Sequence, residues 1–188
     1  TTTTTLPPDF ALAFDGTDDF VSVFDNGDFD FGGGSGMVVE AWVKPTALTS
    51  TGSHAAILRG AFQEPPGGGG AWVLALDNAD HSDWGISGCV PSCNAVSSGA
   101  GGLTVGAWQH IAAMYDGTTL QIYRNGQFLD SAPLSGSLSD VDYLLMGIWT
   151  DSFHGLIDEV RVWGTPRSPA QIQADFNRVL DGTELGLV

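Results

Sequence analysis

Acidic side chains gather where they could bind a hard cation. Asp15 and Gly16 open an acidic turn, and Asp158 interrupts the apolar run Gly155–Trp163. Calcium takes six to eight oxygen ligands, which carboxylates and main-chain carbonyls of a turn supply. An unpaired charge within an apolar strand is costly, so Asp158 needs a partner. That partner is either a metal ion or an arginine of the same strand, unless the acidic pair caps a turn.

Asp18 and Asp19 extend the same turn. They are secondary candidates for the cation, or they only bracket a solvated turn. The four histidines are scattered rather than spaced as metal ligands, so ordinary surface or core positions suit them better.

Aromatic and polar side chains beside loops offer a second kind of site. A sugar ring needs an aromatic platform for its C–H face and a few directed polar groups. Trp84 and Trp149 lie next to predicted loops, as does Trp72. Hydrogen-bonding groups nearby are those of Asp77, Asn78, Asp80, His81 and His154. The competing interpretation is structural, because Trp42, Trp108 and Trp163 fit strand patterns of a core and one of the loop tryptophans could join them.

No arrangement of acids typical of a hydrolase is visible. Glycosidases need two carboxylates held at a defined separation. Glu40 stands alone, and the adjacent Asp158 and Glu159 face opposite sides of a strand. Composition alone does not exclude a Ser-His-Asp site, but the sequence has no Gly-x-Ser-x-Gly elbow.

The charge of the chain narrows its partners. The 188 residues carry 22 acidic and 6 basic side chains, a formal net charge of -16. Such a surface repels phosphate backbones and anionic lipid, so nucleic acid and membrane are poor partners and cations are better ones. Simple solubility explains most of these carboxylates equally well. The sequence contains no run of 18 apolar residues, so direct membrane insertion is not expected, and no signal peptide is visible.

Two cysteines, Cys89 and Cys93, are separated by three residues. We expect a local disulfide, which closes a small ring and implies an oxidising compartment. A redox or metal-binding pair is the alternative, but no βαβ pattern and no second cysteine pair accompany it.

Short apolar runs punctuated by 26 glycines and nine prolines predict an all-β fold. Residues 1–8 are expected to be a linker, and residues 9–188 a single domain. Trp108–Tyr115 and Leu120–Arg124 flank Asp116-Gly117, and Asn125-Gly126 leads into Gln127–Ala132. Since Asx-Gly pairs tolerate the positive φ of tight hairpin turns, these segments predict a three-stranded antiparallel meander.

The remaining strands are expected at Ala11–Phe14, Phe20–Val23, Met37–Pro45, Ala55–Leu58, Ala71–Asp77, Trp84–Ser87, Tyr143–Trp149 and Gly155–Trp163. Phe20–Val23 is expected to continue the sheet of the first strand. Arg59–Gly70 and Cys89–Gly102 are expected to be long loops. Glu40 and Lys44 share a face with Trp42, which suggests that this face is partly open.

A single helix is predicted in Thr165–Asn177. Ser168 can cap it, Pro169 suits its first position, and Ile172 and Phe176 lie four residues apart. We expect this apolar stripe to pack on the edge of a two-sheet antiparallel jelly-roll sandwich.

Four motifs in order resemble one family. AFDGTDDFV, VVEAWVKP, GAWQHIAAMYDGTTLQIYRNG and HGLIDEVRVWGTPRSPAQI match the laminin-G-like jelly-roll family, a relative of the pentraxins within the concanavalin A-like lectin and glucanase sandwiches. The resemblance spans Ala11 to Asn177. It implies two curved sheets, frequently with bound calcium, in a carbohydrate-binding (lectin) or adhesive module attached to larger extracellular proteins. A shared fold does not establish a shared function.

The resemblance also suggests sites. It implies a structural calcium that links Asp15 and Gly16 to Asp158. By analogy with pentraxins, which hold calcium and ligand at this place, Gln63 and Glu64 would meet Trp149 and Asp151 at a rim site, where Asp151 would bind a second calcium ion. This loop departs from the pentraxin pattern because Asp151 is its only acid.

We therefore expect a non-catalytic, secreted or cell-surface module of a larger multidomain chain, with calcium as cofactor and a glycan or a cell-surface or matrix component as ligand. A structural or protein-binding spacer is the alternative, followed by a glycoside hydrolase.

Overall fold

The computed structural model describes residues 10–29, 31, 36–47, 55–62, 70–77, 83–90, 92–98 and 102–188. The side chains of Asp77, Asp83, Trp84, Cys89, Val90 and Ser92 are not described. The predicted linker and the start of the domain at residue 9 lie outside this part of the chain. Within the described residues, no helix is long and apolar enough to cross a bilayer.

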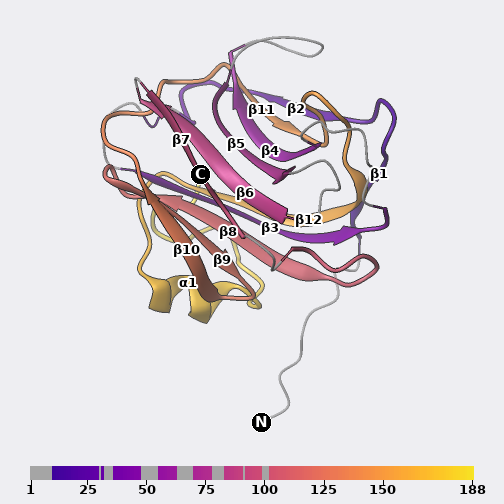
Figure 1. The fold of residues 1–188 in the computed structure, drawn as a ribbon. Helices are drawn as coiled ribbons and strands as arrows, with labels where there is room; N and C mark the ends of the chain where they lie inside the picture. The colour runs from indigo at the N-terminus through magenta and orange to yellow at the C-terminus, as the bar shows by residue number, and fades with distance from the viewer. Residues whose placement is uncertain are drawn as a thin grey trace.

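Two antiparallel sheets stack face to face (Figure 1). The first sheet has the order β1 (Leu12–Asp15), β12 (His154–Trp163), β3 (Met37–Pro45), β8 (Gln109–Tyr115), β9 (Thr119–Arg124) and β10 (Gln127–Pro133). The second has the order β2 (Val21–Phe24), β11 (Tyr143–Met146), β4 (Ala55–Ala61), β5 (Gly70–Asp77), β6 (Asp83–Val90) and β7 (Ser92–Ser97). The predicted jelly-roll sandwich is confirmed.

The predicted meander forms β8, β9 and β10. Gly117 and Gly126 have φ of 89° and 74°, and Asn125 has φ of 50°. Asp116 Oδ1 accepts the N–H groups of Thr118 and Thr119 at 2.9 and 2.8 Å. Both turns therefore use the conformations that Asx-Gly pairs favour.

Several strand predictions were wrong, including the end of Tyr143–Trp149, since β11 ends at Met146. β2 does not continue the sheet of β1 but crosses to the second sheet, where it pairs with β11. The expected loop from Cys89 contains β7, since Val90 and Ser92 already pair across the turn. β4 continues past Leu58 to Ala61, because Arg59 is buried in the strand rather than ending it.

Alternating side chains from both sheets fill the core. Ile57, Leu74 and Ile111 are fully or almost fully buried there. Trp72, which the sequence offered as a binding platform, is 2% exposed within this core. Trp42 and Trp163 are buried as expected, but on the other side of the first sheet. Trp108, expected in the core, is only half-buried.

The predicted helix is α1 (Pro169–Asp175), with Ser168 and Gln171 forming a reciprocal capping box. Its place differs from the expectation. Buried Ile172 packs with Val38 and Met114 in an apolar cluster on the outer face of the first sheet, not on an edge of the sandwich. That face carries apolar side chains in β3, β8 and β12, and the helix removes them from water.

Glu40 lies beneath this cover, so the face around it is closed rather than partly open. The Glu40 side chain is 1% exposed, and its Oε1 accepts the Trp163 indole N–H at 3.0 Å. Arg161 Nη1 lies 3.5 Å from Oε1, and His110 Nε2 lies 3.3 Å from Oε2. Burial alone raises the pKa of Glu40, but these hydrogen bonds and positive charges outweigh it and hold the pKa below its ordinary value.

The same arginine fastens residues 164–188, which we call the C-terminal strap. Arg161 donates to the carbonyl oxygens of Asp175 at 2.9 Å and Arg178 at 2.6 Å. Trp42 Nε1 donates to the carbonyl oxygen of Phe176 at 3.0 Å. Carbonyls at the end of a helix lack partners within the helix. Arg161 and Trp42 supply those partners, so the strap depends on side chains of the sheet.

Glu40→Gln should lower the free energy of unfolding by about 3 kcal/mol, because it removes the buried counter-charge of Arg161. Urea denaturation at pH 7 measures this. Glu159→Gln is the matched control, since Glu159 pairs with the same arginine from a half-exposed position and should cost about 0–1 kcal/mol. Equal losses in the two variants would contradict the proposed importance of Glu40.

Stability should fall in acid through Glu40. A carboxyl whose folded pKa is lowered contributes stability above its unfolded value of 4.5, and that stability is lost as pH falls through the folded pKa. Unfolding free energies of the wild type and Glu40→Gln should therefore converge as pH falls below about 4.5. A constant difference from pH 7 to pH 3 would show that Glu40 does not carry this dependence.

Candidate ligand-binding groove

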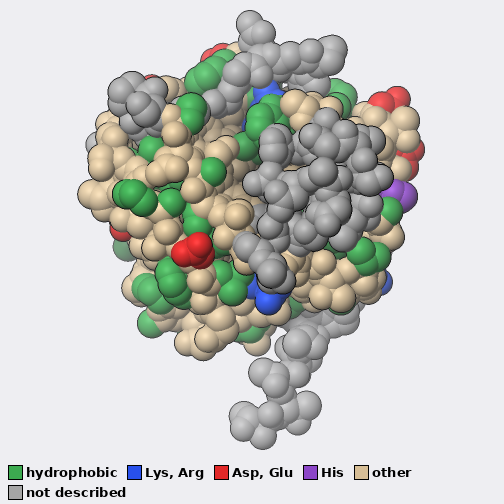
Figure 2. All heavy atoms as spheres, viewed as in Figure 1, with side chains coloured by type: hydrophobic (Ala, Val, Ile, Leu, Met, Phe, Trp, Pro, Cys, Tyr) green, Lys and Arg blue, Asp and Glu red, His purple; other side chains and the backbone are tan. Residues whose placement is uncertain are grey.

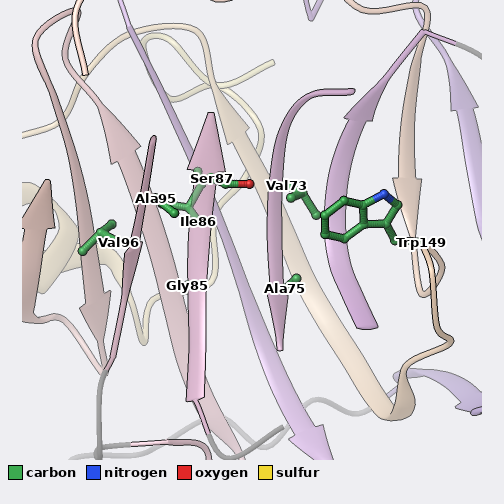
Figure 3. Close-up of a pocket in the computed structure, with 8 residues that line it drawn as sticks. All are labelled: Val73, Ala75, Gly85, Ile86, Ser87, Ala95, Val96 and Trp149. Carbon is green, nitrogen blue, oxygen red and sulfur yellow. The ribbon is translucent and has the colours of Figure 1, made fainter. Parts of the chain in front are cut away.

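A groove crosses the outer face of the second sheet. Two cavities of about 170 and about 240 Å³ share Val73, Ser87 and Trp149. Figure 3 shows lining residues from the neighbouring strands β5, β6 and β7, with the Trp149 ring lying close to Val73. We call these two cavities together the outer groove.

The alternation of side chains along the strands explains which residues form the floor of the outer groove. Trp72 and Leu74 of β5 point into the core, so Val73 and Ala75 belong to the opposite face. On β6 and β7 the lining includes Gly85 and Ala95. Short side chains in a row leave room that larger residues would fill, and the result is a shallow apolar channel.

Trp149 forms one wall. It follows β11 and is 36% exposed. The main-chain N–H of Trp149 donates to the carbonyl oxygen of Asp151 at 3.1 Å, and the main-chain N–H of Phe153 donates to the Gly147 carbonyl at 2.8 Å. Ile148 and Ser152 also bridge, so the chain reverses tightly below the indole. The loop geometry therefore holds an aromatic face beside the apolar floor.

Arg59 is the only charged side chain among the described lining residues. It lies on β4 opposite Val73 of β5 and is 4% exposed. Burial lowers the pKa of the Arg59 guanidinium, but a guanidinium stays protonated at neutral pH. With Ser87, it gives the groove directional hydrogen-bonding groups. Few charged side chains of the described residues are visible in the view of Figure 2, although the chain has 22 acidic residues.

The structure brings together only some of the predicted ligand-binding residues. Trp149 lines the groove, and Asp151 follows in the same loop, where it bridges to Ala55. His154 begins β12 and packs against Gly16, away from the groove. Asp77 ends β5, and Trp84 on β6 pairs in register with Leu76. Gln63, Glu64 and Asn78 lie outside the described residues.

Sequence reasoning missed Arg59, Val73 and Ser87. Arg59 was assigned to a loop because the segment that it begins, Arg59–Gly70, is rich in glycine and interrupted by prolines. The available signal was the alternation of β5, which puts Val73 on the face opposite Trp72. Alternation assigns faces but cannot reveal which face the rest of the chain leaves open.

The predicted cation turn is compact. One carboxylate oxygen from each of Asp15, Asp18 and Asp19 lies within 4.8 Å of the others, and all three residues are exposed. Asp15 N–H donates to Asp19 Oδ2 at 2.9 Å, and Thr17 N–H donates to Asp15 Oδ1 at 2.7 Å. Gly16 has a φ of 78°, and a Cβ there would lie 2.8 Å from His154 Cβ. Three carboxylates at this spacing fit a hard cation.

Asp158 does not join this turn. In the β1–β12 register Asp15 pairs with His154 and Leu12 with Ile157. Asp158 is therefore four residues along β12 from the partner of Asp15, about 13 Å at 3.3 Å per residue. Instead, Asp158 Oδ1 accepts the Glu159 N–H at 2.7 Å, and Glu159 pairs with Arg161 at 3.0 Å. The structure thus favours the alternative of a local turn and an ion pair.

Cys89 and Cys93 lie directly opposite each other in the β6–β7 pair. The structure thus replaces the expected loop with a tight hairpin around the cysteines. This register suits a cross-strand link, and the disulfide stays a prediction.

The comparisons agree with this architecture. Residues 15–173 match the family model described as the concanavalin A-like lectin/glucanases superfamily. The chain belongs to this family, as its motifs predicted. No curated protein sequence matches it.

Solved structures share the fold at low sequence identity. Domain 4 of AbnA, a GH43 extracellular arabinanase from Geobacillus stearothermophilus solved with arabinotriose, has a TM-score of 0.59 and 22% identity over 77% of this chain and 67% of that one. A putative carbohydrate-binding protein from Bacteroides ovatus has a TM-score of 0.65 and 19% identity over 93% and 49%. A heptameric pentraxin from Limulus polyphemus has a TM-score of 0.60 and 13% identity over 86% and 78%. The likeness shows the fold alone.

Proposed function

We propose that this protein is a non-catalytic carbohydrate-binding module that holds an oligosaccharide in the outer groove. One observation carries the proposal: the indole of Trp149 stands beside an apolar floor that also contains Arg59 and Ser87. Sugar rings present a C–H face and a rim of hydroxyls. An aromatic face and a few directed polar groups match both features.

The comparisons support the ligand class. The arabinanase domain was solved with arabinotriose, and the Bacteroides ovatus protein is described as carbohydrate-binding. Both have the same sandwich fold as this chain. They suggest a glycan without identifying its sugars.

The placement of acids supports a binding role rather than hydrolysis. The described lining of the outer groove contains no carboxylate, whereas glycosidases use two. Glu40, the isolated acid noted in the sequence, is buried on the opposite sheet against Trp163 and Arg161. Water and substrate have no access to it.

We also propose that calcium binds to Asp15, Asp18 and Asp19 and stabilises the turn from β1 to β2. These strands belong to different sheets, so a cation there would fasten the two layers at one edge. The acidic composition and the cysteine pair are consistent with an extracellular module of a larger secreted protein. The role of calcium would be structural because His154 and this turn lie away from the groove.

Trp149→Ala should weaken glycan binding by about 30-fold, since losing a central aromatic contact typically costs about 2 kcal/mol. A glycan array selects the ligand, and calorimetry measures the affinity. Phe128→Ala is the matched control, because Phe128 is an exposed aromatic side chain on β10 of the other sheet; it should bind like the wild type. A silent array in calcium would favour a structural spacer, and equal affinities of both variants would exclude this groove.

Chelation should lower the melting temperature. At a calcium concentration of 100 times Kd, a site present only in the folded state adds about 2.7 kcal/mol. Asp18→Asn is the most informative variant, because Asp15 and Asp19 also accept main-chain hydrogen bonds. It should remove the response to chelator, whereas Asp130→Asn on β10 should keep it. A chelator response unchanged in Asp18→Asn would rule out this turn.

A further inference from the structure

A second cavity opens on a different side of the sandwich. It has a volume of about 260 Å³ and lies where the chain enters β1. Phe10, Leu12 and Met146 give it apolar walls, and Asp158 and Glu159 contribute its only charges among the described lining residues. We call it the edge slot. The outer groove is lined by β5, β6 and β7 instead, so the two sites share no residue.

Asp158 is left with an unbalanced charge at this slot. Its carboxylate accepts the Glu159 N–H but forms no ion pair with a described residue. Glu159 gives its own carboxylate to Arg161. Burial and the neighbouring charge of Glu159 raise the pKa of Asp158 above its usual value. A cation arriving beside Asp158 would relieve this repulsion.

The slot adjoins an open strand edge. β1 is the last strand of its sheet, and among the described residues it pairs only with β12. The Asp15 N–H is taken by Asp19, so it points away from β12. Backbone groups two residues apart point the same way in a strand. The N–H and C=O of Ala13 therefore face the open side, where a further strand could pair.

Exposed apolar side chains follow the same edge. Phe10 is 92% exposed and Leu12 is 46% exposed, and in β2, the edge strand of the other sheet, Phe24 is 60% exposed. A second copy of this chain would bring its own carboxylates and a net charge of -16 to this acidic edge. Charge complementarity instead favours a cationic partner.

We propose that this edge binds an extended, basic peptide segment, with a bulky apolar side chain in the edge slot and a lysine or arginine beside Asp158. The segment would add to the open side of β1 by main-chain hydrogen bonds at Ala13. Such strand addition draws affinity from the backbone and specificity from pockets for alternate side chains. The peptide partner is distinct from the glycan ligand.

A blocked heptapeptide with lysine at odd positions and valine, phenylalanine and valine at even positions tests this inference. Titration calorimetry should show that it binds at least about tenfold tighter than the same peptide with glutamate for lysine. Replacing its phenylalanine by serine should weaken binding about tenfold as well. In ¹⁵N spectra the Ala13 amide should shift on binding.

Asp158→Asn should weaken the lysine peptide several-fold, while Asp130→Asn, an exposed acid on β10, should not. Equal effects of both variants, or equal binding of the phenylalanine and serine peptides, would show attraction to overall charge only and overturn the inference. So would absence of binding at about 1 mM peptide, or concentration-dependent dimerisation through this edge. Glycan binding at Trp149 is measured separately and does not depend on these results.

Discussion

The rest of the structure depends on the buried contact among Glu40, Arg161 and Trp163, because it helps to hold the C-terminal strap over the outer face of the first sheet. Glu40 accepts the indole N–H of Trp163, and Arg161 reaches from the same place to the carbonyls at the end of α1. Glu40 and Arg161 offset part of each other's cost of burial. The C-terminal strap covers the outer face of the first sheet, so this face is packed rather than exposed.

The second sheet keeps the face that can meet a ligand. Its outer side has no helix of the described chain over it, and its short side chains leave a channel along Val73 and Ala75. The two outer faces therefore have different chemistry. One is sealed around a buried ion pair, and the other combines an apolar floor with Trp149 and Arg59. Under the proposed function, the first sheet is therefore the supporting sheet and the second is the binding sheet.

The sequence was most informative where local chemistry determines structure. Met37–Pro45 was predicted with its observed bounds, and the Asx-Gly turns and the Ser168 cap were found because each depends on adjacent residues. β7 was missed because glycine and cysteine in its neighbourhood resembled a loop. The closed surroundings of Glu40 could not be predicted, since its cover comes from residues more than 120 positions away.

The site was predictable only in part for the same reason. Trp149 was proposed from its place beside a loop. Arg59 was not, because its role in lining the groove depends on which face of β4 stays uncovered. Asp15 and Asp158 seemed to belong to one metal site from their motifs. Strand register separates them, and register is set by pairing across the sheet rather than by neighbours in the chain.

The most direct test of this account is to titrate ¹⁵N-labelled protein with an oligosaccharide that binds to it and to map the chemical-shift changes of the backbone amides and the indole N–H groups. We expect the largest changes at the Trp149 indole and along β5 and β6, with α1 and β3 unchanged. Changes concentrated on α1 and the outer face of the first sheet would contradict the claim that the ligand binds to the second sheet.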